Sequence, residues 1–209
     1  MMDLSQVQWV RHILLHPVEG FEDMRWKRSG SLKIAFFIVF MLFLGLVADG
    51  RLFGAQFFIS YDKTFNIIPY IVRSIVFFAA WVVGNWSVCT LLDGEGTMRN
   101  ICIYSAYALV PYTAQLFIRT ILSHLLVRDE LVFMDIIRFT FIGWSALLLF
   151  FAVKSVHQYS PAKTILACAL TVGAMCIMLI LLVLFLSLVQ QVYVFIYSLY
   201  TEISYRIRV

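Results

Sequence analysis

The stretch TILACALTVGAMCIMLILLVLFLSLVQQVYVFIYSLY, residues 164–200, decides the class of this protein because it contains no charged side chain. A helix rises about 1.5 Å per residue, so this stretch would be about 55 Å long, whereas the hydrocarbon core of a bilayer is about 30 Å thick. We therefore expect a transmembrane helix that starts near Thr164 and ends its span near Ser187 to Gln191. The aromatic remainder would extend past the membrane or lie in its interface. Its aromatic residues are Tyr193, Phe195, Tyr197 and Tyr200.

Four further apolar runs precede that stretch, and each is about long enough to cross a bilayer. They are Leu32–Val47, Ile67–Leu92, Ile101–Val127 and Leu131–Val153. The sequence thus predicts an all-α fold: a polytopic integral membrane protein with a bundle of five transmembrane helices. We expect residues 1–30 to form an amphipathic cytoplasmic segment, residues 31–200 the five-helix domain, and residues 201–209 a short basic tail.

Composition agrees with a membrane protein and argues against several other classes. Charged residues make up 13% of the chain, against roughly 25% in a soluble domain. The basic residues do not gather with aromatic ones, so no nucleic-acid partner is expected. The cysteines form no CxxC pair and the histidines are scattered, so we expect buried thiols, no metal site and no cofactor. No cleavable signal peptide is expected, because the first long apolar run starts only at Leu32.

The basic residues that flank the spans predict the orientation. Eight lie on the side of the N-terminus: Arg11, Arg25, Lys27, Arg28, Lys33, Arg99, Lys154 and Lys163. Five lie on the other side: Arg51, Lys63, Arg128, Arg206 and Arg208. The positive-inside rule then places the N-terminus in the cytoplasm and the C-terminus outside.

Residues 1–30 contain a helical pattern that Pro17 interrupts. Apolar side chains recur before Pro17 at Leu4, Val7, Val10, Ile13 and Leu14, and continue after it at Phe21, Met24 and Trp26. Two arrangements fit this pattern: a helix in the interface of the inner leaflet, or a helix packed on the cytoplasmic mouth of the bundle.

Two local patterns resemble a known family. The first is HPVEGFED, residues 16–23, ahead of the first span. The second begins at Asn85-Trp86 and continues through LDGEGT, residues 92–97, to AYALVPY, residues 106–112. Together with five predicted spans, these patterns are similar to the Yip-domain family (Ypt-interacting proteins), in particular its bacterial branch. The resemblance covers most of the chain.

The resemblance implies five helices, a cytoplasmic N-terminus and, for a bacterial member, a location in the plasma membrane. In eukaryotes the family acts in vesicle traffic and contacts small GTPases through cytoplasmic segments. This chain lacks a long acidic or polar N-terminal region, so that role is not carried over. Association with other membrane machinery, including transporters, is what the resemblance implies for this chain.

The first candidate site is a layer of intramembrane arginines, Arg73, Arg119 and Arg138. Arg73 lies seven residues after Asn66, Arg119 eight before Val127 and Arg138 seven after Leu131, about 10–12 Å along a helix. Because consecutive spans run in opposite directions, these three ends lie on one side of the membrane and the depths match. A charged side chain at such a depth in the bilayer costs free energy, so an arginine there indicates a functional site. We expect them to face the bundle interior, with Asp135 pairing Arg138 or Arg119. The layer would bind an anion, such as a lipid headgroup or an acidic partner segment. The alternative is snorkelling with internal ion pairs. Further counter-ions on that side are Asp49, Asp62, Asp129 and Glu130.

The second candidate site is the turn Asp93-Gly94-Glu95-Gly96-Thr97, hereafter the 93–97 turn. Two glycines favour a tight turn. The spacing is not that of a P-loop, and no third ligand accompanies the two carboxylates. We expect a structural or partner-docking turn on the cytoplasmic face, with Thr97 capping a short helix beside Asn100.

The third candidate site is a set of polar and aromatic residues in the second and third spans, Asn85, Trp86, Tyr107 and Pro111. An asparagine within a span usually bonds to a neighbouring helix, and Trp86 suits an interfacial anchor. Pro111 is expected to kink the third span near Tyr107. The kink either lines a cavity or serves packing.

No nucleophile has an evident base, so an enzyme is not expected. The sequence favours a non-enzymatic adaptor or scaffold that binds other integral membrane proteins, a transporter permease among them, and membrane lipids. The alternative is a small transporter or lipid-binding protein that uses the arginine layer. Many transporters are built from two internal repeats, and five spans do not divide into equal halves, so a transporter is less favoured. The sequence does not decide whether the chain forms a homo-oligomer.

Overall fold

The computed structural model describes residues 6–27, 29–54, 65–127 and 130–208, and these ranges contain helices, turns and loops but no strand. The all-α prediction is therefore confirmed. Some residues used in the predictions lie outside the described ranges: residues 1–5, Arg28, Asp62, Lys63, Arg128, Asp129 and residue 209.

The helices follow the predicted order. Two short ones come first, α1 (Gln6–Leu15) and α2 (Pro17–Trp26). The spans are α3 (Leu32–Arg51), then α4 (Ile68–Ile71), the π-helix η2 (Val72–Val76) and α5 (Phe77–Leu91), then α6 (Met98–Ala108) and α7 (Val110–Leu122), then α8 (Leu131–His157) and α9 (Pro161–Arg208). In the described part of the chain, five helical segments are long and apolar enough to cross a membrane, which confirms the predicted spans.

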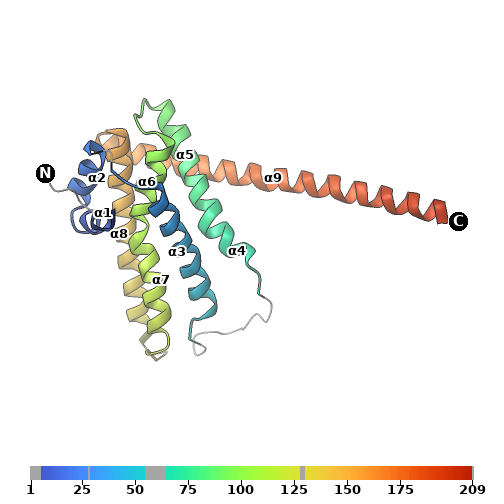
Figure 1. The fold of residues 1–209 in the computed structure, drawn as a ribbon, viewed down its shortest axis with the longest axis horizontal. Coiled ribbons are helices and arrows are strands. Elements are labelled where there is room, and N and C mark those ends of the chain that lie inside the picture. The colour runs from blue at the N-terminus through green and yellow to red at the C-terminus, as the bar shows by residue number, and fades with distance from the viewer. Residues whose placement is uncertain (1–5, 28, 55–64, 128–129, 209) are drawn as a thin grey trace.

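The spans α3, α5, α6–α7 and α8 lie side by side, whereas α9 leaves the bundle at a steep angle (Figure 1). Helices α1 and α2 lie at the end of the bundle where α5 ends and α8 meets α9. We call this end the N-terminal face, meaning α1, α2, residues 92–97 and residues 155–160. It brings together segments that are far apart in the sequence.

Helices α1 and α2 pack on the bundle, which is the second of the two predicted arrangements. Ile13 of α1 and Phe21 and Met24 of α2 are buried in the same core as Ile101 of α6. The two short helices approach closely, because a Cβ at Gly20 would lie 2.8 Å from the Cα of Ile13. The glycine of the HPVEGFED pattern therefore serves this helix–helix contact.

The third span is broken at Leu109, between α6 and α7. Pro111 lies in the first turn of α7, where its missing N–H costs nothing. The predicted kink is therefore present, and Tyr107, one turn earlier, is buried.

Helix α9 is continuous over 48 residues, about 72 Å at 1.5 Å per residue. It does not end at Ser187 to Gln191, so the aromatic remainder extends the helix and forms no separate segment. Thr164, Ala167 and Thr171 are buried and share one helical face at spacings of three and four. Every residue from 180 to 200 is exposed. Only the first part of α9 therefore packs on the bundle.

Candidate interaction site on the N-terminal face

The 93–97 turn is a compact connection between α5 and α6. Asp93 adopts a left-handed conformation with φ of 55°, and the Gly94 N–H donates to the Cys89 carbonyl at 2.8 Å. Thr97 caps α6, because its hydroxyl accepts from the Asn100 N–H at 3.4 Å. The predicted tight turn and helix cap are both present.

The two glycines of the turn are required by the close approach of α8. A Cβ at Gly94 would lie 2.6 Å from the Tyr159 hydroxyl, and one at Gly96 would lie 2.5 Å from Cε1 of His157. The backbone of the turn therefore rests directly on the end of α8. Sequence reasoning assigned these glycines to turn geometry alone and missed this contact.

His157 connects the turn to two spans through buried hydrogen bonds. The Gly96 N–H donates to Nδ1 of His157 at 3.3 Å, and Nε2 lies 3.1 Å from Oδ1 of Asn85. Nδ1 must be an acceptor here, so Nε2 carries the proton and donates to Asn85. Nδ2 of Asn85 then donates to the Thr171 hydroxyl at 3.2 Å.

We call Asn85, Gly96, His157 and Thr171 the His157 network. The side chains of its three polar members are buried, and the Thr171 hydroxyl donates onward to the Ala167 carbonyl at 2.7 Å. Every bond in the series has one donor and one acceptor, which is what a buried polar network requires. Both ring nitrogens of His157 are thereby used, so this histidine is not available as a base.

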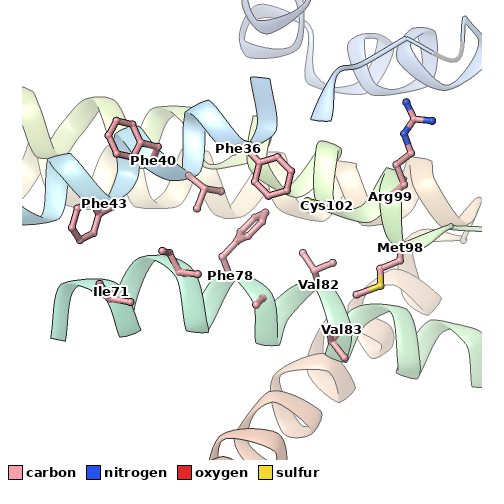
Figure 2. Close-up of a pocket in the computed structure, with 13 residues that line it drawn as sticks. Phe36, Phe40, Phe43, Ile71, Phe78, Val82, Val83, Met98, Arg99 and Cys102 are labelled. Atoms are coloured by element: carbon pink, nitrogen blue, oxygen red, sulfur yellow. The ribbon is translucent and has the colours of Figure 1, made fainter. Parts of the chain in front are cut away.

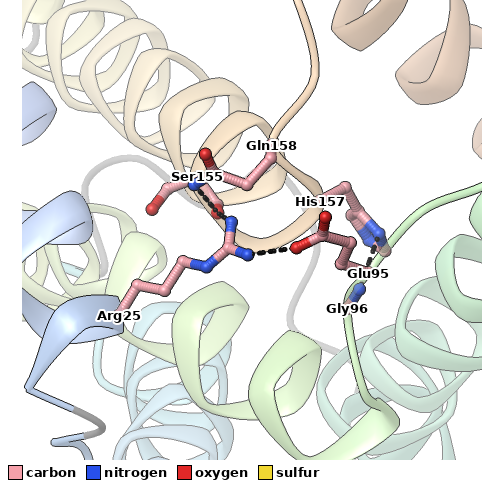
Figure 3. A network of polar contacts seen from close by, with 6 residues as sticks. All are labelled: Arg25, Glu95, Gly96, Ser155, His157 and Gln158. Atoms are coloured by element: carbon pink, nitrogen blue, oxygen red, sulfur yellow. Dashed lines mark hydrogen bonds and ion pairs between the residues drawn. The ribbon is translucent and has the colours of Figure 1, made fainter.

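Tyr159 and Arg25 add two further links across the N-terminal face. The Tyr159 hydroxyl lies 3.1 Å from the carbonyl oxygens of Cys89 and of Leu92, and burial raises the pKa of this phenol. Arg25 of α2 donates to the Ser155 carbonyl at 2.9 Å and pairs with Glu95 (Figure 3). Direct bonds therefore join the turn to α2, α5 and α8, and the His157 network connects it indirectly to α9.

The outer surface of the 93–97 turn is polar and accessible. Asp93, Thr97 and Arg99 are exposed, and the Glu95 side chain is 66% exposed despite its ion pair. The backbone of the turn is held by the side chains of His157 and Tyr159, and its polar side chains are accessible. Such a surface is suited to binding a partner protein, because the turn loses little conformational entropy when the partner binds.

Asn85 was expected to bond to a neighbouring helix, and it does so through His157 of α8 and Thr171 of α9. Trp86 is 42% exposed, at the end of α5 where an interfacial anchor was expected. Sequence reasoning missed His157, Tyr159 and Thr171. No sequence signal marked them, because a histidine, a tyrosine and a threonine at helix ends or within a span are common.

The arginine layer is only partly as predicted. Arg119 is the interior member, with 15% of its side chain exposed, and it pairs with Asp49 of α3 at 3.5 Å. The predicted pairing of Asp135 with Arg119 is therefore wrong, and Asp135 makes no ion pair with any described residue. Asp135 is exposed, although its neighbour Met134 in the same turn of α8 is buried.

Arg73 and Arg138 are exposed, so the expectation that all three arginines face the interior holds for Arg119 alone. They nevertheless share one neighbourhood. Tyr112 of α7 interacts electrostatically with Asp49 and with all three arginines. Arg119 is the buried member of this set, and the matching depths stay a prediction.

One family model matches the chain: the Yip1 domain, over residues 11–185. This range includes α2, the 93–97 turn, all four residues of the His157 network and most of the spans. Searches of the curated proteins and of the solved structures find no significant match.

Proposed function

The chain belongs to the Yip1 domain family, and from this premise we propose that it is a non-enzymatic integral membrane adaptor. It binds other integral membrane proteins, with a transporter permease as one class of partner, through α9 and the 93–97 turn. The setting is a bacterial plasma membrane, with the N-terminal face in the cytoplasm and the C-terminus outside.

The observation that carries this proposal is the accessible surface of α9. The most apolar window of this helix has no buried residue, although α3 and α5–α8 bury part of theirs. A helix of this kind contacts either lipid or another transmembrane helix. Its exposed side chains include Phe185, Tyr193 and Tyr197, and aromatic residues are enriched where proteins bind one another.

The 93–97 turn supports the same function on the N-terminal face. Its backbone is held by His157 and Tyr159, while Asp93 and Glu95 present carboxylates outward. The exposed carboxylate of Asp93 suits a basic segment of a partner, whereas that of Glu95 already pairs with Arg25.

Photo-crosslinking in native membranes tests the proposal. The photoreactive residue p-benzoylphenylalanine is placed at Phe185 of α9 and, as a control, at Phe139 of α8, which is equally exposed to the surroundings. We expect Phe185 to give adducts with another integral membrane protein that mass spectrometry identifies, and Phe139 to give few. Adducts of Phe185 with lipid alone would contradict the adaptor function, and adducts with the same chain would assign α9 to a homo-oligomer.

A second function, a small transporter or lipid-binding protein, is favoured by the arginine cluster. Arg73 and Arg138 are exposed and, with the Arg119–Asp49 pair, act electrostatically on Tyr112, so the three arginines carry two more positive charges than their single paired carboxylate offsets. Uptake or release of a labelled anion by vesicles that contain the purified chain tests this function. Transport that Arg138→Gln abolishes would favour it over the adaptor.

A further inference from the structure

Arg99 lies between two cavities of opposite character. One is an apolar groove of about 830 Å³ between α3 and α4–α5. The other is a polar pocket of about 360 Å³ on the N-terminal face. Arg99, in the first turn of α6, lines both of them. Figure 2 shows its guanidinium at one end of the groove, directed toward the N-terminal face.

The groove has the length and chemistry of an acyl-chain site. Its walls are aromatic and aliphatic, with Phe36, Phe40 and Phe43 on α3 facing Ile71 and Phe78 on the second span (Figure 2). From Ile71 to Val83 the second span advances twelve residues, about 18 Å along its axis. Both walls belong to membrane spans, so lipid chains are the apolar molecules that surround them.

The polar pocket has the chemistry of a phosphate site. Arg99 makes no ion pair with any residue that the structure describes, and it supplies the one cationic charge of the pocket lining that no carboxylate offsets. The pocket also includes the N-terminal turn of α6, whose positive end favours anions. Its one carboxylate, Glu95, is neutralised by Arg25.

A tyrosine without a hydrogen-bond partner provides an independent indication that the polar pocket holds a ligand. Tyr104 lines the pocket and is 4% exposed. One face of its ring stacks on Phe21 at 5.8 Å between centroids. Its hydroxyl has no hydrogen-bond partner among the described residues. An oxygen acceptor in the pocket would accept a hydrogen bond from this hydroxyl.

We propose that the groove and the polar pocket together form a site for one anionic phospholipid. The phosphate lies against Arg99 and accepts a hydrogen bond from Tyr104, while one acyl chain occupies the groove toward Ile71. The continuity of the two cavities at Arg99 favours a lipid over a soluble phosphate, because only a lipid fills both. No residue of this site belongs to α9, so the lipid titration and the α9 crosslinking can fail separately, and Glu95 is the one residue of the 93–97 turn that lines the polar pocket.

Native mass spectrometry of the full chain in mild detergent tests the lipid site. The delipidated protein is titrated with phosphatidylglycerol and, separately, with zwitterionic phosphatidylcholine. We expect Arg99→Gln to weaken phosphatidylglycerol binding about tenfold, the size expected for a lost charge-assisted hydrogen bond. Phosphatidylcholine carries the same phosphate together with a choline cation, so we expect it to bind the wild type more weakly than phosphatidylglycerol does. Lys33→Gln removes an exposed cation of α3 that lines neither cavity and serves as the matched control.

A second pair of variants tests the groove. Ala79 is exposed and lines it, so Ala79→Phe fills the groove without disturbing the core and should weaken both lipids. Ala146→Phe on α8 makes the same change at an exposed position that lines neither cavity and should weaken neither. Equal phosphatidylglycerol affinity in the wild type and in Arg99→Gln would overturn the proposal. Competition by glycerol 3-phosphate at the affinity of the lipid would also overturn it, in favour of a soluble phosphate.

Discussion

The glycines of the 93–97 turn are the most sharply constrained residues of the N-terminal face. Gly96→Ala places a methyl group against Val156 and His157, and overpacking of this kind costs about 1–3 kcal/mol. We expect a lower midpoint of thermal unfolding, followed by tryptophan fluorescence of the protein in detergent.

Gly143 and Gly173 provide the matched control for this substitution. Nothing lies within 4 Å of a Cβ built at either position, and alanine is favoured over glycine inside a helix by about 0.5–1 kcal/mol. Gly143→Ala should therefore keep or raise the unfolding midpoint. An equal loss in Gly96→Ala and Gly143→Ala would show that the turn does not rest on α8 as described.

The bond between Asn85 and Thr171 is suited to a double-mutant cycle. Asn85→Ala and Thr171→Val each leave a buried polar group of the His157 network without its partner. Coupling between side chains of membrane helices averages about 0.6 kcal/mol and reaches about 1.7. We expect a coupling free energy within that range in the unfolding free energies, and a value of zero would remove the bond from the network.

At the scale of elements, the Arg119–Asp49 pair joins α7 to α3. Both side chains are mostly buried, so removing one partner leaves an uncompensated charge, which costs more than removing both. We expect Arg119→Leu or Asp49→Leu alone to destabilise the protein by about 1–3 kcal/mol, and the double variant to lose less than either. Asp135→Asn, at an exposed position, should change nothing in the same unfolding measurement.

The elements themselves were largely predictable. Long apolar runs give the spans, Pro17 and Pro111 give the two helix boundaries near them, and Thr97 gives the cap of α6, because each signal is local. The His157 network was not predictable, because its members come from four separate segments of the chain. The counter-ion of Arg119 was misassigned for a related reason: a helical period identifies neighbours within a helix but does not rank candidates across helices.

At the scale of the whole molecule, the odd number of spans predicts termini on opposite sides of the membrane. Glu22 of α2 and Glu202 of α9 are exposed and can each be replaced by cysteine in a cysteine-free background. We expect a membrane-impermeant thiol reagent, applied to intact cells, to label the cysteine at position 202 and not the one at position 22. Labelling of both from the same side would refute this orientation.

Truncation separates the two parts of α9. A chain that ends after Gln190 keeps Thr164, Ala167 and Thr171, the buried face of the helix, and should unfold at nearly the wild-type temperature. A chain that ends after Tyr159 lacks Thr171 and should be destabilised by more than the loss of one hydrogen bond, about 1 kcal/mol, because the packing of α9 on α5 is lost too. Equal stability of the two truncated chains would contradict this division.

The late position of Thr171 in the chain has a consequence for biosynthesis. During translation, Asn85, the 93–97 turn and His157 leave the ribosome and enter the membrane before Thr171 does. Until α9 is inserted, the amide donor of Asn85 lacks its partner Thr171. The nascent protein therefore reaches its stable form only when its last helix is in place, and an interrupted translation product is left as a substrate for membrane proteolysis.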